Sequence, residues 1–353
     1  MKLNLLIILT LLASLSSCSK KKSSNQNLME SGKIPDFEAQ EAPTFPALKI
    51  TDCRGNIKDI VCIVNPAKDG NYKAKRECIG DNSEYIETFE KIFDNYPKPL
   101  QQMFCSIRII LIEKEFFATA YASNAKDKEG NITGAVLGIR KSVIDQSLDL
   151  SQWASWKEQL SFGGVTDSYS SSSSLPEIIT TSKTKANDFL YFVIAHEFGH
   201  FFDYANTINQ FDECSGDQYK CPASKGSWTD LSWDHEYRIN DANFFSYAPA
   251  LCFYNCKDNY ISISNVNNIY TDMFATNFIS SYAASNPWDD FAESIAYYVM
   301  DKYLQTNYIL KTNQGLEFDV IKSLHSRQFD QKYKFVDKFL NGNKIKYPGI
   351  QYN

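Results

Sequence analysis

The sequence predicts an α+β fold in which a twisted, mostly antiparallel sheet packs beside one apolar helix and a helical part follows towards the C-terminus. Three observations lead to this class. Runs of β-branched residues lie between residues 107 and 139, and such residues favour strands. Residues 188–206 are apolar nearly all round, as in a buried helix. Asn286-Pro287-Trp288 then forms a helix-start signal, and two further helices are expected after it.

The N-terminal residues have the pattern of an export signal. A basic start is followed by the apolar run Leu3–Leu12, which is too short to span a bilayer comfortably as a helix. Leu15-Ser16-Ser17-Cys18 then resembles a bacterial lipobox, in which the cysteine is lipid-modified and becomes the new N-terminus. We therefore expect residues 1–17 to be removed and Cys18 to anchor the protein at the cell envelope, at the outer membrane or the cell surface. The alternative is an ordinary secretory signal with an incidental cysteine.

The rest of the chain is expected to divide into a tether and a folded part. Residues 18–46 are polar, contain three prolines and bury too little to order themselves, which predicts a flexible tether. Residues 47–345 are expected to form one domain, with a strand-rich part over 47–165 and the apolar helix and helical part over 176–345. A serine-rich segment at 168–174 separates the two parts and is predicted to be a loop.

Composition limits the partners and indicates the compartment. The net charge is −6 and no basic stripe carries interleaved aromatics, so nucleic acid is not an expected partner. Of nine cysteines, eight remain when Cys18 is set aside, and an even number in an exported chain indicates disulfides. A cysteine metal cluster is the rival interpretation, which the lack of a C-x-x-C pair disfavours. The simplest pairing joins neighbours along the chain: Cys53 with Cys62, Cys78 with Cys105, Cys214 with Cys221 and Cys252 with Cys256.

The elements of the folded part follow from periodicity and from helix breakers. Residues 83–96 place apolar side chains on one helical face, and the prolines that follow end the helix. Strands are predicted at 107–112, 116–122 and 132–139, and a helix begins within 141–148. One of these strands is the candidate edge that holds an extended peptide beside the apolar helix. An irregular, disulfide-pinned insertion is predicted at 206–282, and helices at 288–304, 316–324 and 335–340.

The apolar helix carries the motif His196-Glu197-Phe198-Gly199-His200. Two histidines four apart share one helical face, where a single Zn²⁺ can take a nitrogen from each. Glu197 can reach a metal-bound water and accept its proton as general base. The alternative is a buried helix whose histidines are satisfied by carbonyl groups. The apolar flanks argue against it, because ionisable groups on a buried helix are costly unless they are paired or metal-bound.

A third ligand is expected at the start of the helix predicted at 288–304. Asp289 and Glu293 are four residues apart and share a face. One carboxylate can bind zinc, and the other can accept a hydrogen bond from the far N–H of a histidine ligand and so fix its tautomer. The alternative is an acidic first turn that only complements the helix dipole.

These motifs together resemble a known family. HEFGH, a tyrosine seven residues before Asp289, and an acidic residue four after it are similar to the gluzincin metallopeptidases, in particular the anthrax lethal factor-like group and related bacterial zinc-binding lipoproteins. The resemblance implies a zincin-like fold, with His196 and His200 as zinc ligands and Glu197 as general base. It further implies that Asp289 takes the place of the ligand glutamate, Glu293 that of the acid behind a histidine, and Tyr282 that of the residue stabilising the oxyanion.

The sequence departs from this family at Asp289, whose side chain is one methylene shorter than glutamate. Either the helix approaches more closely or Glu293 is the ligand, and His235 is the next candidate. The expected function is zinc-dependent hydrolysis of peptide bonds in a protein or peptide substrate. Two alternatives remain: a surface lipoprotein that binds zinc without turnover, and a zinc amidase or endopeptidase that acts on peptidoglycan.

Overall fold

The computed structural model describes residues 36–37, 53–66, 76–163, 176–181, 186–213, 221–254, 256, 260–312, 315–342 and 344–350. The predicted export signal, Cys18 and the serine-rich segment at 168–174 lie outside these residues, as does nearly all of the tether. The division of the chain into signal, tether and domain therefore stays a prediction. Among the described residues, no helix combines the length and hydropathy needed to cross a membrane.

The fold is α+β, as predicted. Within the described residues the helices are α1 (Ile57–Ile60), α2 (Ser83–Asn95), α3 (Lys98–Phe104), α4 (Lys141–Asp145), α5 (Leu150–Gln159), α6 (Phe189–Asn206), α7 (Val266–Phe274), α8 (Pro287–Val299), α9 (Val320–Leu324) and α10 (Asp330–Leu340). The strands are β1 (Asp36–Phe37), β2 (Val61–Val64), β3 (Ile107–Glu113), β4 (Ala120–Lys126), β5 (Ile132–Arg140), β6 (Glu177–Thr181), β7 (Trp233–His235), β8 (Arg238–Ile239), β9 (Asn307–Lys311) and β10 (Glu317–Asp319).

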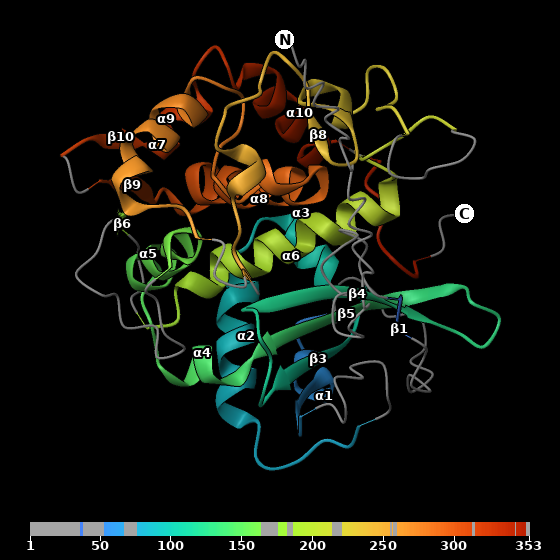
Figure 1. Ribbon diagram of the computed structural model, residues 1–353. Helices are drawn as coiled ribbons and strands as arrows, with labels where there is room; N and C mark the ends of the chain where they lie inside the picture. The colour runs from blue at the N-terminus through green and yellow to red at the C-terminus, as the bar shows by residue number, and fades with distance from the viewer. Residues whose placement is uncertain are drawn as a thin grey trace, which may run out of the picture.

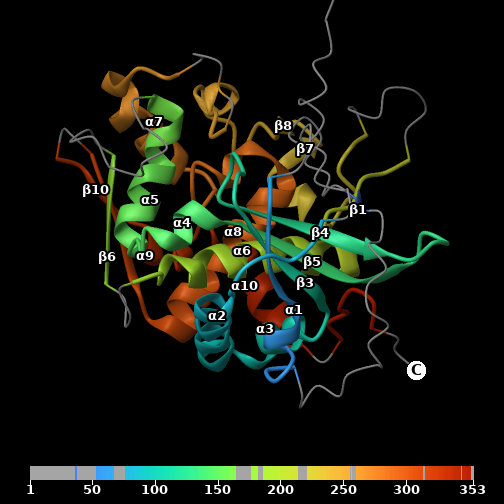
Figure 2. The ribbon, with the colours of Figure 1, turned by 90° about the horizontal axis from the view of Figure 1, so that it is seen from below.

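Helix α6 lies between the main sheet and the C-terminal helices. Figure 1 shows it crossing the middle of the molecule, with β3, β4 and β5 below it and α7, α8, α9 and α10 above it. Figure 2, seen from below, shows the strands of this sheet in front of α6. The helix contacts both β4 and α8, and one hydrophobic cluster joins side chains of β3, β5, α6, α8 and α10. The predicted motif is therefore carried by the element that both layers share.

The main sheet differs from the prediction in the direction of its strands. Its order is β1-β4-β5-β3-β2, and only β4 and β5 pair in antiparallel fashion. The pairs β1–β4, β5–β3 and β3–β2 are parallel, so the expectation of a mostly antiparallel sheet is wrong. The physical reason is the fully buried strand β2, which the sequence analysis did not assign. Parallel neighbours need a crossover, and α2 and α3 supply it between β2 and β3.

Most predicted elements fall close to their expected places. The helix at 83–96, the strands at 107–112 and 132–139, and the apolar helix appear as α2, β3, β5 and α6. The strand predicted at 116–122 begins only at Ala120, because Phe116 folds back onto the ring of Tyr121. The helix predicted at 288–304 is α8 followed by a π-helical turn, Met300–Leu304. The start of the helix predicted at 316–324 instead pairs with β9 as strand β10.

The disulfides confirm one predicted pair and contradict two. Cys252 is bonded to Cys256, as predicted. The structure joins Cys53 to Cys105 and Cys62 to Cys78, so the neighbour pairs Cys53–Cys62 and Cys78–Cys105 are wrong. The reason is again β2, which holds Cys62 within the sheet, where residue 78 forms a bridge to the end of the same strand. Cys221 is disulfide-bonded as well, and its predicted partner Cys214 lies outside the described residues.

Candidate metal centre

Helix α6 places two histidines on one face. His196 and His200 are four residues apart, so their side chains lie one turn apart along the helix axis. Their Nε2 atoms are 3.2 Å apart. Most of the helix is buried, and His196 itself is only 7% exposed. The two ring nitrogens therefore face a common point that has little contact with solvent.

The N-terminus of α8 brings a carboxylate to the same point. Oδ1 of Asp289 lies 3.4 Å from Nε2 of His196 and 3.4 Å from Nε2 of His200. Asn286, the N-cap of α8, accepts a hydrogen bond from the backbone N–H of Asp289 at 2.8 Å and donates one from its side chain to Oδ2 at 2.5 Å. Ser285 donates a longer hydrogen bond to Oδ2, at 3.3 Å. One oxygen of Asp289 is thus held by the helix cap, and the other faces the histidines.

A glycine allows the two helices to approach this closely. A Cβ atom at Gly199 would lie 2.6 Å from the Cα of Ala292 on α8, which is closer than real Cβ contacts come. The backbones of α6 and α8 therefore meet where only glycine fits. This close approach compensates for the short side chain of Asp289, one of the two arrangements that the sequence left open.

A polar link fixes the start of α8 to the end of α6. Asp203 accepts two hydrogen bonds from Asn209, one from its backbone N–H at 2.7 Å and one from its side-chain amide at 2.9 Å. The same amide donates to the carbonyl oxygen of Pro287 at 3.1 Å. Because Pro287 is the first residue of α8, this link holds the N-terminal turn beside the histidine helix.

Glu293 lies behind His196, on the side away from Asp289. Its Oε1 is 2.9 Å from Nδ1 of His196, within ion-pair distance. The same oxygen accepts a hydrogen bond from Nζ of Lys157 at 2.7 Å, and Oε2 accepts one from Oγ of Ser280 at 2.7 Å. The two acids of α8 thus face different nitrogens: Asp289 lies at Nε2 and Glu293 at Nδ1.

The electrostatics of this cluster favour a positive charge between the side chains. Burial lowers the pKa of His196, but Asp289 and Glu293 outweigh burial and raise this pKa to about 9. Burial raises the pKa of Asp289, but both histidines outweigh it and hold the pKa well below its usual range. Burial also raises the pKa of Glu293, but Lys157 and His196 outweigh burial and lower this pKa to about 2. Both carboxylates are therefore anionic at neutral pH.

Two further side chains border the cluster. Glu197 is 6% exposed, and burial raises the pKa of its carboxyl group despite the opposing effect of the two histidines. The ring of Tyr282 lies 5.7 Å from that of His196, centroid to centroid, and the ring of Phe253 packs against its edge at 4.7 Å. Burial and, next, the charge of Asp289 raise the pKa of Tyr282 well above its ordinary value, so its hydroxyl group stays protonated.

The structure brings together most of the residues that the sequence singled out. Within the described residues, His196, His200 and Asp289 form the group whose ligand atoms could hold one metal ion. Glu197, Tyr282 and Glu293 surround this group. His235 lies apart in the β7–β8 hairpin, where its Nδ1 accepts a hydrogen bond from the backbone N–H of Tyr237.

Three residues in the site were missed by sequence reasoning. Lys157 comes from α5, for which no helix is predicted, and Ser280 precedes α8 in the stretch interpreted as irregular. Asn286 is recognisable as a helix-start residue, but its contact with the carboxylate of Asp289 is not. A helix-start asparagine three residues before an acid is the signal that could have found this contact.

Comparison with known proteins finds a similarity over the C-terminal part of the chain. Residues 256–343 match the model of the family Peptidase_Mx, described as "Putative zinc-binding metallo-peptidase". The similarity is to zinc metallopeptidases. The matched residues include Tyr282, Asp289 and Glu293 but not the two histidines of α6. No curated protein and no solved structure matches the chain significantly. The gluzincin and lethal factor-like subgroup stays a prediction from the motifs.

Proposed function

We propose that this protein is a zinc-dependent peptidase that hydrolyses peptide bonds of a protein or peptide substrate. One observation carries the proposal: two imidazole nitrogens and one carboxylate oxygen converge from α6 and α8, with Glu197 adjacent to the first histidine. The lipobox at Cys18 would place this peptidase at the outer membrane or the cell surface, attached through a lipid anchor. The similarity of residues 256–343 to zinc metallopeptidases supports the same chemistry.

The spacing of the three ligand atoms fits a zinc ion. Tetrahedral ligands at about 2.0–2.1 Å from Zn²⁺ are separated by ~3.3 Å from one another. The three separations observed are 3.2, 3.4 and 3.4 Å. Two imidazole nitrogens with one carboxylate oxygen form a typical donor set of catalytic zinc, which leaves the fourth position for water or substrate.

Each side chain around this position would have a separate role in the reaction. A bound zinc ion would supply Lewis acidity and lower the pKa of a water molecule to about 7. Glu197, whose pKa is raised by burial, would accept the proton of the attacking water and pass it to the leaving amine. The protonated hydroxyl group of Tyr282 would donate a hydrogen bond to the oxyanion.

Glu293 would act on the histidine rather than on the substrate. Its Oε1, 2.9 Å from Nδ1 of His196, is placed to accept the N–H of that nitrogen. A proton held on Nδ1 leaves the lone pair of Nε2 directed at the metal position, which fixes the tautomer and the ring orientation.

The test combines metal analysis with a peptide-library digest of the mature protein. We expect one zinc per molecule in the wild type and cleavage of the library. The variant Glu197→Gln should retain zinc, because Glu197 is not a proposed ligand, and lose nearly all turnover. Cleavage of peptidoglycan fragments but of no library peptide would indicate the amidase alternative. A zinc-loaded wild type without either activity would indicate a binding protein.

A further inference from the structure

Lys157 is a buried lysine close to the proposed metal centre. It lies on α5, is 4% exposed, and its Nζ donates a 2.7 Å hydrogen bond to Oε1 of Glu293, which is itself fully buried. A lysine is almost never buried unless it is paired. Burying such a pair also carries a desolvation cost, so the pair alone is weak evidence for a gain in stability. Its position relative to the histidines is therefore informative.

The ammonium group also contacts an aromatic surface. Nζ of Lys157 lies 4.4 Å from the ring centroid of Tyr282, and 5.3 and 5.5 Å from those of Phe192 and Trp153. A cation within about 6 Å of a ring face is attracted by its quadrupole, most strongly where water is excluded. One charged group thus contacts both Glu293 and Tyr282, the two residues that adjoin His196 through its Nδ1 atom and its ring.

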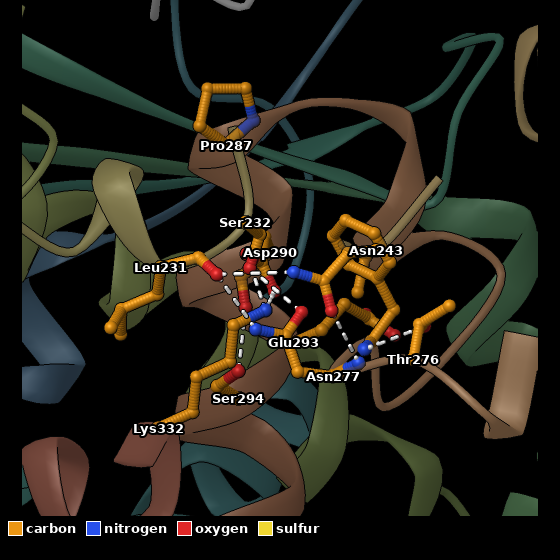
Figure 3. Close-up of polar contacts among 12 residues, drawn as sticks. Leu231, Ser232, Asn243, Thr276, Asn277, Pro287, Asp290, Glu293, Ser294 and Lys332 are labelled. Atoms are coloured by element: carbon orange, nitrogen blue, oxygen red, sulfur yellow. Dashed lines mark hydrogen bonds and ion pairs between the residues drawn. The ribbon is translucent and has the colours of Figure 1, made fainter. Parts of the chain in front are cut away.

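A second buried lysine, Lys332 of α10, also pairs with a carboxylate of α8 and provides a comparison. Lys332 is fully buried and pairs with Asp290 of α8, with Nζ at 2.6 and 2.7 Å from the two carboxylate oxygens. Its Nζ also lies 4.6 Å from the ring centroid of Phe278. Figure 3 shows Lys332 reaching Asp290, with Glu293 nearby on α8. Each lysine pairs a buried ammonium group with a carboxylate of α8 and contacts an aromatic ring. Only the carboxylate that pairs with Lys157 also contacts a histidine of the motif.

We infer that Lys157 is a positioning residue of the zinc centre, which directs Glu293 at Nδ1 of His196 and fixes the ring of Tyr282. This inference rests on the proposed function. Oε1 of Glu293 is shared between Nζ of Lys157 and Nδ1 of His196. Without the ammonium group, the described residues that contact the carboxylate would be His196 at Oε1 and Ser280 at Oε2. The carboxylate could then rotate away from the histidine, and the ring of Tyr282 would lose the cation on its face.

The experiment compares Lys157→Met with Lys332→Met, because each change removes a buried ammonium group and keeps a long apolar side chain. Zinc affinity is measured by chelator competition on folded protein, together with kcat and KM. Loss of a group that supports a ligand typically lowers metal affinity about 10–100-fold, which is the effect expected for Lys157→Met. Its kcat should fall with little change in KM. Lys332→Met should lower the Tm and leave zinc affinity unchanged. Equal zinc affinities of the two variants would overturn the inference.

A double variant covers the case in which Lys157→Met does not fold because Glu293 is left as an unpaired buried charge. Lys157→Met combined with Glu293→Gln removes both charges and should fold. If Lys157 acts on zinc through Glu293, the double variant should bind zinc as tightly as Glu293→Gln alone. A further loss of zinc affinity in the double variant would overturn that route. The proposed function itself is judged on the wild type, and it fails if wild-type protein binds no zinc.

Discussion

Replacing Gly199 by alanine should weaken zinc binding more than it weakens the fold. The added Cβ would lie 2.6 Å from the Cα of Ala292 and 3.1 Å from its Cβ. Carbon atoms in favourable contact are about 3.5–4.0 Å apart, so α8 must retreat by roughly 1 Å. Oδ1 of Asp289 now lies 3.4 Å from both Nε2 atoms. The same retreat would lengthen these separations by up to ~1 Å, well above the ~3.3 Å spacing of tetrahedral zinc ligands.

The loss of folding stability should be small, because two effects oppose each other. Overpacking a core costs about 1–3 kcal/mol, whereas alanine is favoured over glycine in a helix interior by about 1 kcal/mol. We therefore expect the free energy of unfolding to fall by roughly 0–2 kcal/mol. A displacement of about 1 Å in a catalytic site can reduce activity by about 100-fold. Zinc affinity should fall by at least about 10-fold, as for the loss of a supporting contact.

The assay is chelator competition for zinc affinity, with urea unfolding in EDTA for stability. The informative control is a rescue by Asp289→Glu in the Gly199→Ala background, because the extra methylene restores the reach that the retreat of α8 removes. The double variant should bind zinc more tightly than Gly199→Ala alone. Wild-type zinc affinity in Gly199→Ala, or no recovery in the double variant, would refute the reasoning from helix separation.

Three further predictions follow from the proposed roles. Asp289→Ala should yield protein with little zinc after dialysis, whereas Glu293→Ala should lose about 10–100-fold in affinity and still bind zinc at saturating metal; the opposite pattern would exchange the two roles. The folded-state pKa of Glu293 is about 2, below the ordinary value of about 4.3. Between these values the unfolded chain binds more protons, so stability should fall as the pH falls, by roughly 3 kcal/mol in total. Urea unfolding in EDTA from about pH 5 to about pH 2 should show a weaker pH dependence in Glu293→Gln, and an unchanged one would contradict the pairing. Cys18→Ala should move the protein from the membrane fraction to the soluble fraction, and an unchanged distribution on cell fractionation would argue against the lipid anchor.

The residues of the candidate site could be singled out from the sequence because their signals are local. His196 and His200, and likewise Asp289 and Glu293, are pairs four residues apart, and this spacing places each pair on one helical face. The division of roles between the two acids depends on how closely α6 and α8 approach. That distance is set by Gly199 against Ala292, two residues nearly a hundred positions apart. Such a contact leaves no periodic signal in the sequence.

The parts that were missed have a common physical cause. Helix α5 buries polar side chains, among them Lys157, Glu158 and Gln159, so it lacks the apolar stripe by which a helix is recognised. Strand β2 is only four residues long and buried throughout, and short apolar runs do not distinguish a strand from a helix. Because β2 was not predicted, the crossover formed by α2 and α3 and the parallel pairing of β2 with β3 were missed. The disulfides of Cys53 and Cys62 were missed for the same reason.

The disulfide between Cys252 and Cys256 makes the position of Tyr282 depend on the redox state of the compartment in which the protein folds. The bond closes a short loop that carries Phe253 and Tyr254, whose rings pack against Tyr282 at centroid distances of 4.7 and 6.3 Å. Reduction of this bond would free the loop, and the side of Tyr282 that faces it would lose its support. A chain that folds among cytoplasmic thiols would therefore have the histidines and acids of α6 and α8 in place, but a less ordered tyrosine. If the predicted export signal is used, formation of this disulfide after export would then order the tyrosine.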